Sequence, residues 1–187
     1  MDALKAIEER RAVRSYDSRA VDRATVERLI QAAIQAPSAV NAQPWAFAVI
    51  QDRKLLARVA AEAKALLLSG GLREELSGKY REILESPGFD IFYGAGTLII
   101  ICADTEKPNA SEDCSLAGEN LMLAATSLGL GTCPIGFARP YLNLPEVKEE
   151  LGIAPHLAPV LPIIVGWPTG ETPRPPREEP RIVFWRA

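Results

Sequence analysis

Two groups of arginines are the residues in this sequence best suited to bind an anion. Arg10, Arg11 and Arg14 lie near the start of the chain, and Arg174 and Arg177 lie near its end. A guanidinium group can bind a phosphate through paired hydrogen bonds, and a charged hydrogen bond contributes about 1.5–3 kcal/mol. Two or three such contacts plus burial of a ring system would reach about −8 kcal/mol, which is micromolar binding. The alternative is that these arginines are solvated surface charges, which contribute little.

A polar segment at residues 37–45 offers groups that could recognise a heterocycle. Ser38, Asn41 and Gln43 carry short hydrogen-bonding side chains, and two prolines stiffen the backbone around them. Functional side chains are common in loops between rigid elements. A ring with carbonyl and N–H edges needs donors and acceptors of this kind. The alternative is an ordinary turn whose polar groups are already satisfied.

A third segment, residues 129–136, has the sequence Gly-Leu-Gly-Thr-Cys-Pro-Ile-Gly. Because glycine lacks a Cβ, Gly136 would let a ligand approach the backbone closely. The alternative is a helix end followed by a tight turn. Residues 131–136 also have the glycine spacing of a phosphate-binding P-loop. Phe137 and Ala138 follow instead of the required Lys and Ser or Thr, which excludes a nucleoside triphosphate loop.

Other common chemistries lack their residues. The single histidine, His156, excludes a multi-histidine metal site, and no cysteine pair compensates. No Gly-x-Ser-x-Gly and no Gly-x-Gly-x-x-Gly occurs. A cofactor must therefore supply any demanding chemistry. A thiol redox protein using Cys114 or Cys133 is an alternative, but the wide spacing of the cysteines disfavours it. Because free cysteines are commonly buried, we expect the three cysteines to be core residues.

Hydrophobic periodicity predicts the elements that must hold these segments. In the first half, we expect a helix that Asp2 caps and that runs through Arg11, a helix around residues 26–34 that Pro37 ends, a strand at 45–50, and a helix after Asp52. The apolar run at 97–102 predicts a strand in the interior of a sheet. Between them, residues 69–96 predict two short helical pieces punctuated by glycine-containing turns, followed by a loop with three aromatics.

The second half predicts a long buried helix and a last core strand. Ser111 should cap a helix that runs to Leu128 and is apolar almost all round, which suits the core or a partner subunit. A short helix at 145–151 and a strand at 160–165 follow, and Pro162 indicates that one side of this strand lies at an edge. We expect residues 1–167 to form the body. The proline-rich residues 168–187 should form an extended arm whose apolar end packs on a partner subunit.

The bulk properties bound the class of protein. The chain of 187 residues suits one domain. A net charge of −3 gives no general nucleic-acid footprint. No run approaches the ~20 apolar residues that cross a bilayer, and the N-terminus lacks the layout of a signal peptide. We therefore expect a cytoplasmic protein with neither nucleic acid nor membrane as partner.

Taken in order, these segments resemble the FMN-dependent nitroreductase family. The resemblance rests on residues 10–16, 36–45, 120–125 (Asn-Leu-Met-Leu-Ala-Ala), 129–136, and 166–168 with 173–177, and it spans nearly the whole chain. It implies an α+β fold with a central, mostly antiparallel sheet flanked by helices. It also implies an intertwined homodimer in which each flavin lies at the subunit interface and a C-terminal arm extends to the partner.

The resemblance also implies which residues bind FMN. Arg14 matches a basic position near the flavin N1–C2 carbonyl edge, where a cation stabilises the negative charge that forms on reduction. By similarity, the residues around the phosphate and this ring edge are Arg10, Arg11, Ala12 and Arg14, with Arg174 and Arg177 from the arm. Pro37, Ser38, Ala39, Asn41 and Gln43 match a loop that contacts flavin largely from the other subunit. Pro134, Ile135 and Gly136 match backbone near N5.

The implied activity is a ping-pong transfer of hydride from NADH or NADPH to flavin N5, and then to a nitroaromatic, quinone or similar small acceptor. No side chain need act as a nucleophile, and Arg14 is the candidate for tuning the flavin. The alternatives are an FMN storage or sensor protein without turnover, and a related dehalogenase, ene-reductase or flavin-fragmenting enzyme.

The sequence departs from the family pattern at three places. Ala39 stands where many relatives have a second serine, so one hydroxyl contact is missing. Arg181 could fill the basic position of the arm as well as Arg174 or Arg177. The segment 66–93, which shapes the substrate pocket in relatives, is compact here.

Overall fold

A four-stranded antiparallel sheet forms the centre of the fold. The computed structural model describes residues 1–69, 74 and 77–187. The strand order is β1-β2-β4-β3, so β2 and β4 are the inner strands. Their bounds are Trp45–Ile50 for β1, Thr97–Asp104 for β2, Gly131–Pro134 for β3 and Leu157–Gly166 for β4.

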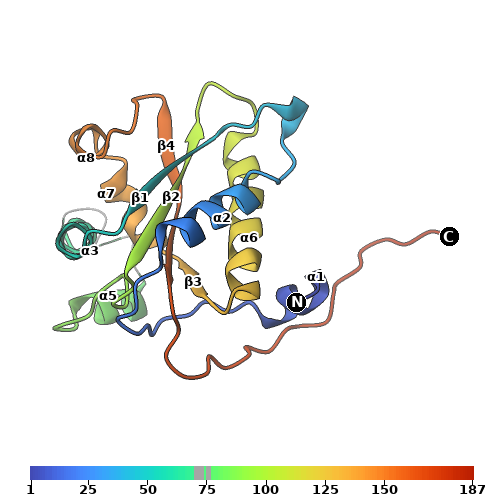
Figure 1. The fold of residues 1–187 in the computed structure, drawn as a ribbon, viewed down its shortest axis with the longest axis horizontal. Coiled ribbons are helices and arrows are strands. Elements are labelled where there is room, and N and C mark those ends of the chain that lie inside the picture. Colours follow the sequence, from blue (N-terminus) through green and yellow to red (C-terminus); the bar gives the residue numbers. More distant parts are fainter. Residues whose placement is uncertain (70–73, 75–76) are drawn as a thin grey trace.

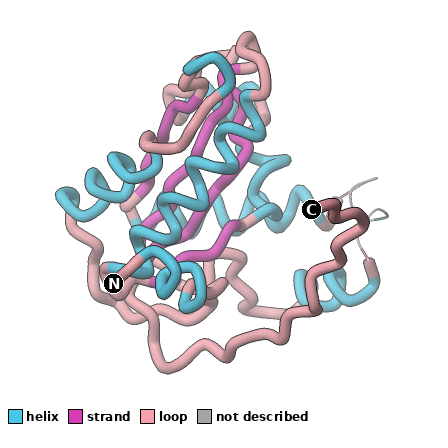
Figure 2. Tube along the Cα trace, turned by 90° about the vertical axis from the view of Figure 1, so that its right-hand side faces the viewer, coloured by secondary structure: helices cyan, strands magenta, loops and turns pink. Residues whose placement is uncertain are grey.

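Helices cover both faces of this sheet (Figure 1). Helix α6 runs along the strands on one face, as Figure 2 shows, and α2 packs with it. Helices α3 and α7 pack on the opposite face, with α8 beside α7. The bounds are α1 Ala3–Glu9, α2 Arg23–Ala33, α3 Arg53–Leu67, α5 Gly78–Glu85, α6 Ala110–Ser127, α7 Arg139–Leu142 and α8 Pro145–Glu150, with short 3₁₀ helices η1 Ala39–Asn41 and η2 Gly136–Ala138.

The core has two layers because β2 is apolar on both faces. Leu98 and Ile100 join the cluster under α3, whereas Ile99 and Ile101 join the cluster under α6. Successive side chains of a strand point to opposite faces, so an unbroken apolar run is what an interior strand requires. The structure confirms the expected α+β class and the interior position of this strand.

Most predicted elements are present, and three details of the predictions are wrong. Helix α1 ends at Glu9, so Arg10 is its C-terminal cap and Arg11 lies outside the helix. The N-cap of α6 is Asn109 in a left-handed conformation, instead of Ser111. Residues 131–134, for which no strand was predicted, form β3, which pairs with the last four residues of β4. Four residues are too few to give a periodic signal.

Two further predictions concern irregular parts of the chain. Pro162 lies in β4 one residue beyond the end of its pairing with β3, and its carbonyl accepts a hydrogen bond from the Ile135 amide at 2.8 Å. The missing N–H of proline therefore costs no strand pairing. β4 as a whole is an inner strand, and it lacks a second strand neighbour only before Ile163, so the predicted edge holds for that part alone. Of the two short helical pieces expected in 69–96, the second is α5, and the first lies outside the described residues.

Pro168 and Thr169 still pair with Tyr16 and Ser15 of the body, and the chain beyond them contains neither helix nor strand and runs away from the body (Figure 1). Ile182, Val183, Phe184 and Trp185 are largely exposed there. The predicted division into a body of residues 1–167 and an arm of 168–187 that packs on a partner stays a prediction.

Candidate functional site

The basic segment after α1 lies against the short strand β3. The Val13 amide donates to the Thr132 carbonyl at 2.9 Å. Gly131 and Gly166 are cross-strand partners beneath this segment. A Cβ on Gly131 would lie 2.8 Å from the Val13 side chain, and a Cβ on Gly166 would lie 2.8 Å from the ring of Tyr16. The two glycines therefore leave the space in which the segment carrying Arg10 to Tyr16 closes over the end of the sheet.

This arrangement places Arg14 at a cavity of about 560 Å³. Among the described residues that line it, Arg14 alone carries a charge. The predicted residues Pro134, Ile135 and Gly136 also line it, so the structure brings the first and third chemical segments together. The sequence reasoning did not assign the remaining lining residues, which are Tyr80, Ile83, Tyr93, Cys133 and Phe137.

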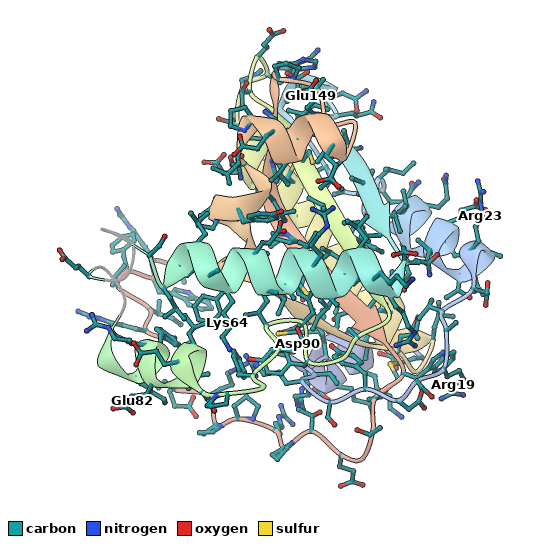
Figure 3. The ribbon with its side chains drawn as sticks, turned by 90° about the vertical axis from the view of Figure 1, so that its left-hand side faces the viewer. Arg19, Arg23, Lys64, Glu82, Asp90 and Glu149 are labelled. Carbon is teal, nitrogen blue, oxygen red and sulfur yellow. The ribbon has the colours of Figure 1, made fainter. Side chains whose placement is uncertain are left out.

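The turn that carries Tyr93 is shaped by a carboxylate. Asp90 accepts hydrogen bonds from the amides of Phe92 at 2.8 Å and Gly94 at 2.9 Å, and Tyr93 between them has a φ of 53°. Lys64 of α3 fixes the residues before this turn, because its ammonium group donates hydrogen bonds to the carbonyls of Ser86 and Phe89, both at 3.1 Å. Figure 3 labels Lys64 and Asp90 at this junction below α3. The aromatic run in the sequence marked this loop but could not tell Tyr93, at the cavity, from its buried neighbour Phe92.

The electrostatics of the cavity are set by Arg14. Its guanidinium group lies 5.9 Å from the centre of the Tyr93 ring, and Nη1 is 3.4 Å from the carbonyl of Ala12. Burial raises the pKa of Tyr93 and of the Cys133 thiol, and Arg14 opposes both shifts. Burial raises the pKa of Tyr16 far above its usual range. All three groups stay neutral at pH 7, so the cavity presents a net positive charge to a ligand.

The other arginines of the basic segment are already engaged. Arg10 forms an ion pair with Glu119 of α6 at 3.2 Å, and its side chain is only 22% exposed. Arg11 donates to the carbonyls of Glu8 and Arg10 at 2.5 and 2.7 Å. Of the three arginines in this segment, Arg14 therefore has the guanidinium group most available to a ligand.

Gly136 has no local reason to be glycine. A Cβ built on it meets nothing within 4 Å, and its φ is not in the left-handed region. Gly136 lines this cavity and also a neighbouring pocket formed with Arg139, Pro140 and Asn143, so an added Cβ would enter open space. The neighbouring Ile135 is buried in the core and anchors this backbone through the bond to Pro162. The described packing around Gly136 therefore does not by itself require glycine, which leaves its backbone open to close approach.

The predicted flavin-contacting loop, Pro37 to Gln43, lies away from the Arg14 cavity of the same chain. The loop leads into β1 at Trp45, which through the strand pairing lies at the same height in the sheet as Ala158 of β4. Pro134 of β3 pairs with Ile163 of the same strand. Five residues of strand separate these levels by about 16 Å. Figure 1 shows the loop and β3 near opposite ends of α6. One copy of the chain therefore does not bring its loop to its own Arg14 cavity.

The loop is nevertheless built as a rigid unit. Ser38 Oγ accepts from the Gln43 amide at 3.0 Å, and the Gln43 side chain donates to Asn41 Oδ1 at 3.3 Å. The Ala39 amide donates to Asp113 of α6 at 3.0 Å. Pro37, Asn41 and Gln43 are exposed, as are Arg174 and Arg177 of the arm, for which the described part of the chain offers no partner.

The fold agrees with comparisons to known proteins. A family model described as the nitroreductase family matches residues 7–167. The chain belongs to this family. The resemblance that the ordered motifs gave is thereby confirmed, and with it the expected fold class.

Individual members of the family are related at modest identity. FMN reductase (NAD(P)H) of Bacillus subtilis is 26% identical over 189 residues, covering 94% of this chain and 70% of that protein. Iodotyrosine deiodinase of Thermotoga neapolitana is 28% identical over 157 residues and 80% of each chain. A crystal structure of a nitroreductase with bound FMN from Desulfitobacterium hafniense superimposes with a TM-score of 0.85 at 28% identity over 100% of both chains. Among the described helices of this chain, none has the length and apolar character needed to cross a membrane.

Proposed function

We propose that this protein is a homodimeric, FMN-dependent oxidoreductase that takes hydride from NADH or NADPH and passes it to a small aromatic or quinone-like acceptor. The observation that carries the proposal is the cavity that Arg14 lines together with Gly136, a glycine that this chain's own packing does not require. The relatives named for FMN and NAD(P)H support the same assignment.

The cavity and its lining fit a flavin. A volume of about 560 Å³ lies in the roughly 300–1,000 Å³ range of small-molecule sites. Arg14 would lie at the pyrimidine edge of the ring, and the backbone at Gly136 would lie near N5. Tyr93 and Phe137 offer apolar contact area beside them. Arg10 would help to hold the phosphate by exchanging its ion pair with Glu119, and Arg174 or Arg177 would complete that contact from the arm.

The residues of the cavity position and polarise the reactants. FMN, when bound, supplies the chemistry of hydride transfer through N5. The fixed guanidinium charge of Arg14 would favour the reduced, negatively charged ring over the oxidised one. Tyr16, Tyr93 and Cys133 keep their protons at neutral pH, so none of them is a base or a nucleophile. Because one cavity would serve both substrates, the oxidised nicotinamide must leave before the acceptor enters, which gives ping-pong kinetics.

A second copy of the chain would complete the site. The rigid loop with Ser38, Asn41 and Gln43 is too far from the Arg14 cavity of its own chain, so it would contact the flavin of the partner. Residues 1–167 would form the body and 168–187 the arm. The exposed apolar run Ile182 to Trp185 would pack on the partner, since exposed apolar patches of this kind mark interaction sites.

Reductive dehalogenation is a second candidate function. The similarity to the iodotyrosine deiodinase extends over 80% of each chain, and three aromatic side chains, Tyr80, Tyr93 and Phe137, line the cavity. Halide release from an iodinated or brominated phenol, measured with an ion-selective electrode, distinguishes this activity from reduction of a quinone or a nitroarene.

The absorption spectrum of the purified protein tests the main proposal. We expect flavin bands that bleach when NADH or NADPH is added without oxygen and that return when menadione or nitrobenzene is added. Flavin bands that resist both donors would favour storage or sensing. A protein that is colourless and does not take up added FMN would refute the proposal altogether.

Subunit complementation tests whether the site is shared between two copies. The variants Arg14→Ala and Asn41→Ala damage different halves of the site, so each alone should lose most activity. In randomly mixed dimers, half are heterodimers with one intact site of two, and activity should recover to about a quarter of the wild-type value. Matched mixtures of Arg14→Ala with Arg14→Gln serve as the control and should show no recovery. A mixture of the two complementary variants that recovers nothing would contradict the shared site.

A further inference from the structure

Asp113 is a buried carboxylate that the proposed mechanism does not use. It lies in the first turn of α6, only 5% exposed, between the core residues Ala110 and Ala117. Burying a charged carboxylate is costly unless hydrogen bonds and charges compensate it. The positive end of the helix dipole offsets part of this cost. Among the described residues outside its own helix, the Asp113 side chain accepts one hydrogen bond, from the amide of Ala39, 74 positions earlier.

The loop that donates this hydrogen bond is strained. Val40, Asn41 and Gln43 have φ values of 48°, 56° and 45°. Left-handed conformations cost non-glycine residues on the order of 1–3 kcal/mol each, and they persist only where surrounding contacts impose them. A β-branched residue such as Val40 is an outlier in this region. Strain of this kind is found at ligand-binding sites more often than in ordinary turns.

Contacts within the loop do not by themselves fix its position on the body. The hydrogen bonds from the Gln43 amide to Ser38 Oγ, and from the Asn41 amide to the Ser38 carbonyl, both at 3.0 Å, set the internal shape. At the far end, the Pro44 carbonyl accepts from the Asp104 amide at 2.8 Å and joins the loop to β2. At the near end, the Ala39 amide is held by Asp113 at 3.0 Å. The carboxylate is therefore the anchor that orients the first half of the loop.

The oriented loop faces outward. Val40 is 90% exposed at its tip, and Asn41 and Gln43 are exposed as well. We propose that Asp113 is a positioning residue that holds the strained loop of residues 38–43 in the conformation in which it contacts the flavin of a second copy. This inference rests on the proposed function, because the flavin and the second copy are the loop's ligand and partner.

Binding of FMN to the purified apoprotein dimer tests the role. Asp113→Ala removes the anchor, and we expect the Kd for FMN, measured by quenching of flavin fluorescence, to rise about tenfold or more. Asp113→Asn keeps an acceptor oxygen at the same place, so its Kd should stay within about threefold of the wild-type value. Glu112→Ala, an exposed acid one position earlier on the same helix, is the matched control for the loss of charge and should bind FMN normally.

A second variant approaches the same hydrogen bond from the loop. Ala39→Pro removes the amide donor and leaves Asp113 intact. The preceding Ser38 has φ −142° and ψ 151°, which is the extended conformation that a following proline requires. Ala39→Pro should weaken FMN binding as much as Asp113→Ala does. It therefore tests the same hydrogen bond if Asp113→Ala folds poorly. Melting temperature and dimer mass are measured alongside, because a purely structural role would lower stability without changing the Kd of the folded dimer.

The outcomes separate the two hypotheses. A wild-type protein that binds no FMN refutes the proposed function and this inference with it. A wild-type protein that binds and turns over FMN, with Asp113→Ala and Ala39→Pro unchanged in Kd, refutes the positioning role alone. An Asp113→Asn variant as weak as Asp113→Ala would also overturn it, because the acceptor oxygen would then not be what matters.

Discussion

Replacing Gly136 by alanine tests whether a ligand, and not the fold, requires glycine at this position. The added Cβ meets no protein atom within 4 Å, and the backbone there is compatible with an L side chain. Gly131→Ala is the contrasting variant five residues earlier, since its Cβ would lie 2.8 Å from three atoms of the Val13 side chain. The two substitutions add the same methyl group to the same short segment.

The structure gives opposite signs for the two effects on stability. A Gly→Ala change at a compatible site stabilises by about 0.4–1 kcal/mol, because the unfolded chain loses conformational freedom. For a chain of this length, Gly136→Ala should therefore raise the Tm by roughly 1–4 °C. Gly131→Ala should lower it by several degrees, since overpacking costs about 1–3 kcal/mol. The same overpacking cost, applied to a flavin seated against Gly136, would raise the Kd for FMN about 5- to 150-fold.

Two measurements on each variant suffice. Calorimetry of the apoprotein gives the Tm, and fluorescence titration gives the Kd for FMN. Gly136→Ala should be at least as stable as the wild type and yet bind FMN poorly. A lower Tm would mean that the fold itself requires glycine at 136. A normal Tm with a wild-type Kd would mean that no ring approaches this backbone, and the placement of the flavin would be wrong.

Three further predictions test other parts of the molecule. Arg14→Gln should raise the Kd for FMN by about 10- to 150-fold, as expected for a lost charged hydrogen bond of about 1.5–3 kcal/mol. Arg28→Gln, on the exposed surface of α2, is the control and should leave the Kd unchanged. Equal Kd values for the two variants would show that Arg14 does not contact FMN. Removing residues 182–187 should convert the dimer to monomer in light scattering after size exclusion, and an unchanged dimer mass would show that the arm is dispensable. Tyr141 donates to Glu62, and burial and this carboxylate raise its pKa to about 12. Because the folded state keeps the proton longer than the unfolded state, stability should fall between about pH 10 and 12, by up to about 1.4 kcal/mol per pH unit. Urea unfolding of Tyr141→Phe should lack this part of the pH dependence, and identical profiles would contradict it.

The sequence predicted most of the fold because the main elements carry strong local signals. Strand β1 has the predicted bounds, and the burial of Val26, Leu29 and Ala33 on α2 follows the helical period. The errors fall where signals are short or compete. β3 has four residues, two of them glycine and proline, and its pairing with β4 is a tertiary contact that no local pattern encodes. At α6, Ser111 is a good capping residue by type, but Asn109 tolerates the left-handed conformation that starts the helix earlier.

The candidate site was predictable only in part, for a different reason. Arg14 and the glycine segment could be named from residue type, and the structure brings them to one cavity. Tyr80, Ile83 and Phe137 were missed because apolar and aromatic residues look like core in a sequence, and their place at a cavity depends on packing. The engagement of Arg10 by Glu119 was equally invisible, since it joins residues more than 100 positions apart.

The residues that break local rules concentrate at the two halves of the site. Val40, Asn41 and Gln43 accept left-handed strain, Asp113 accepts burial, and Gly136 gives up a side chain that the fold would tolerate. Natural sequences are locally consistent except where function demands otherwise. Three of these exceptions lie in a loop that leads into β1 at Trp45, about 16 Å along the sheet from Pro134 at the cavity, so the loop of a single chain does not reach its own cavity. A two-fold symmetric pair of chains resolves this, because each copy can then offer its loop to the cavity of the other. The strain and the separation together therefore favour a flavin site shared between subunits over a site within one.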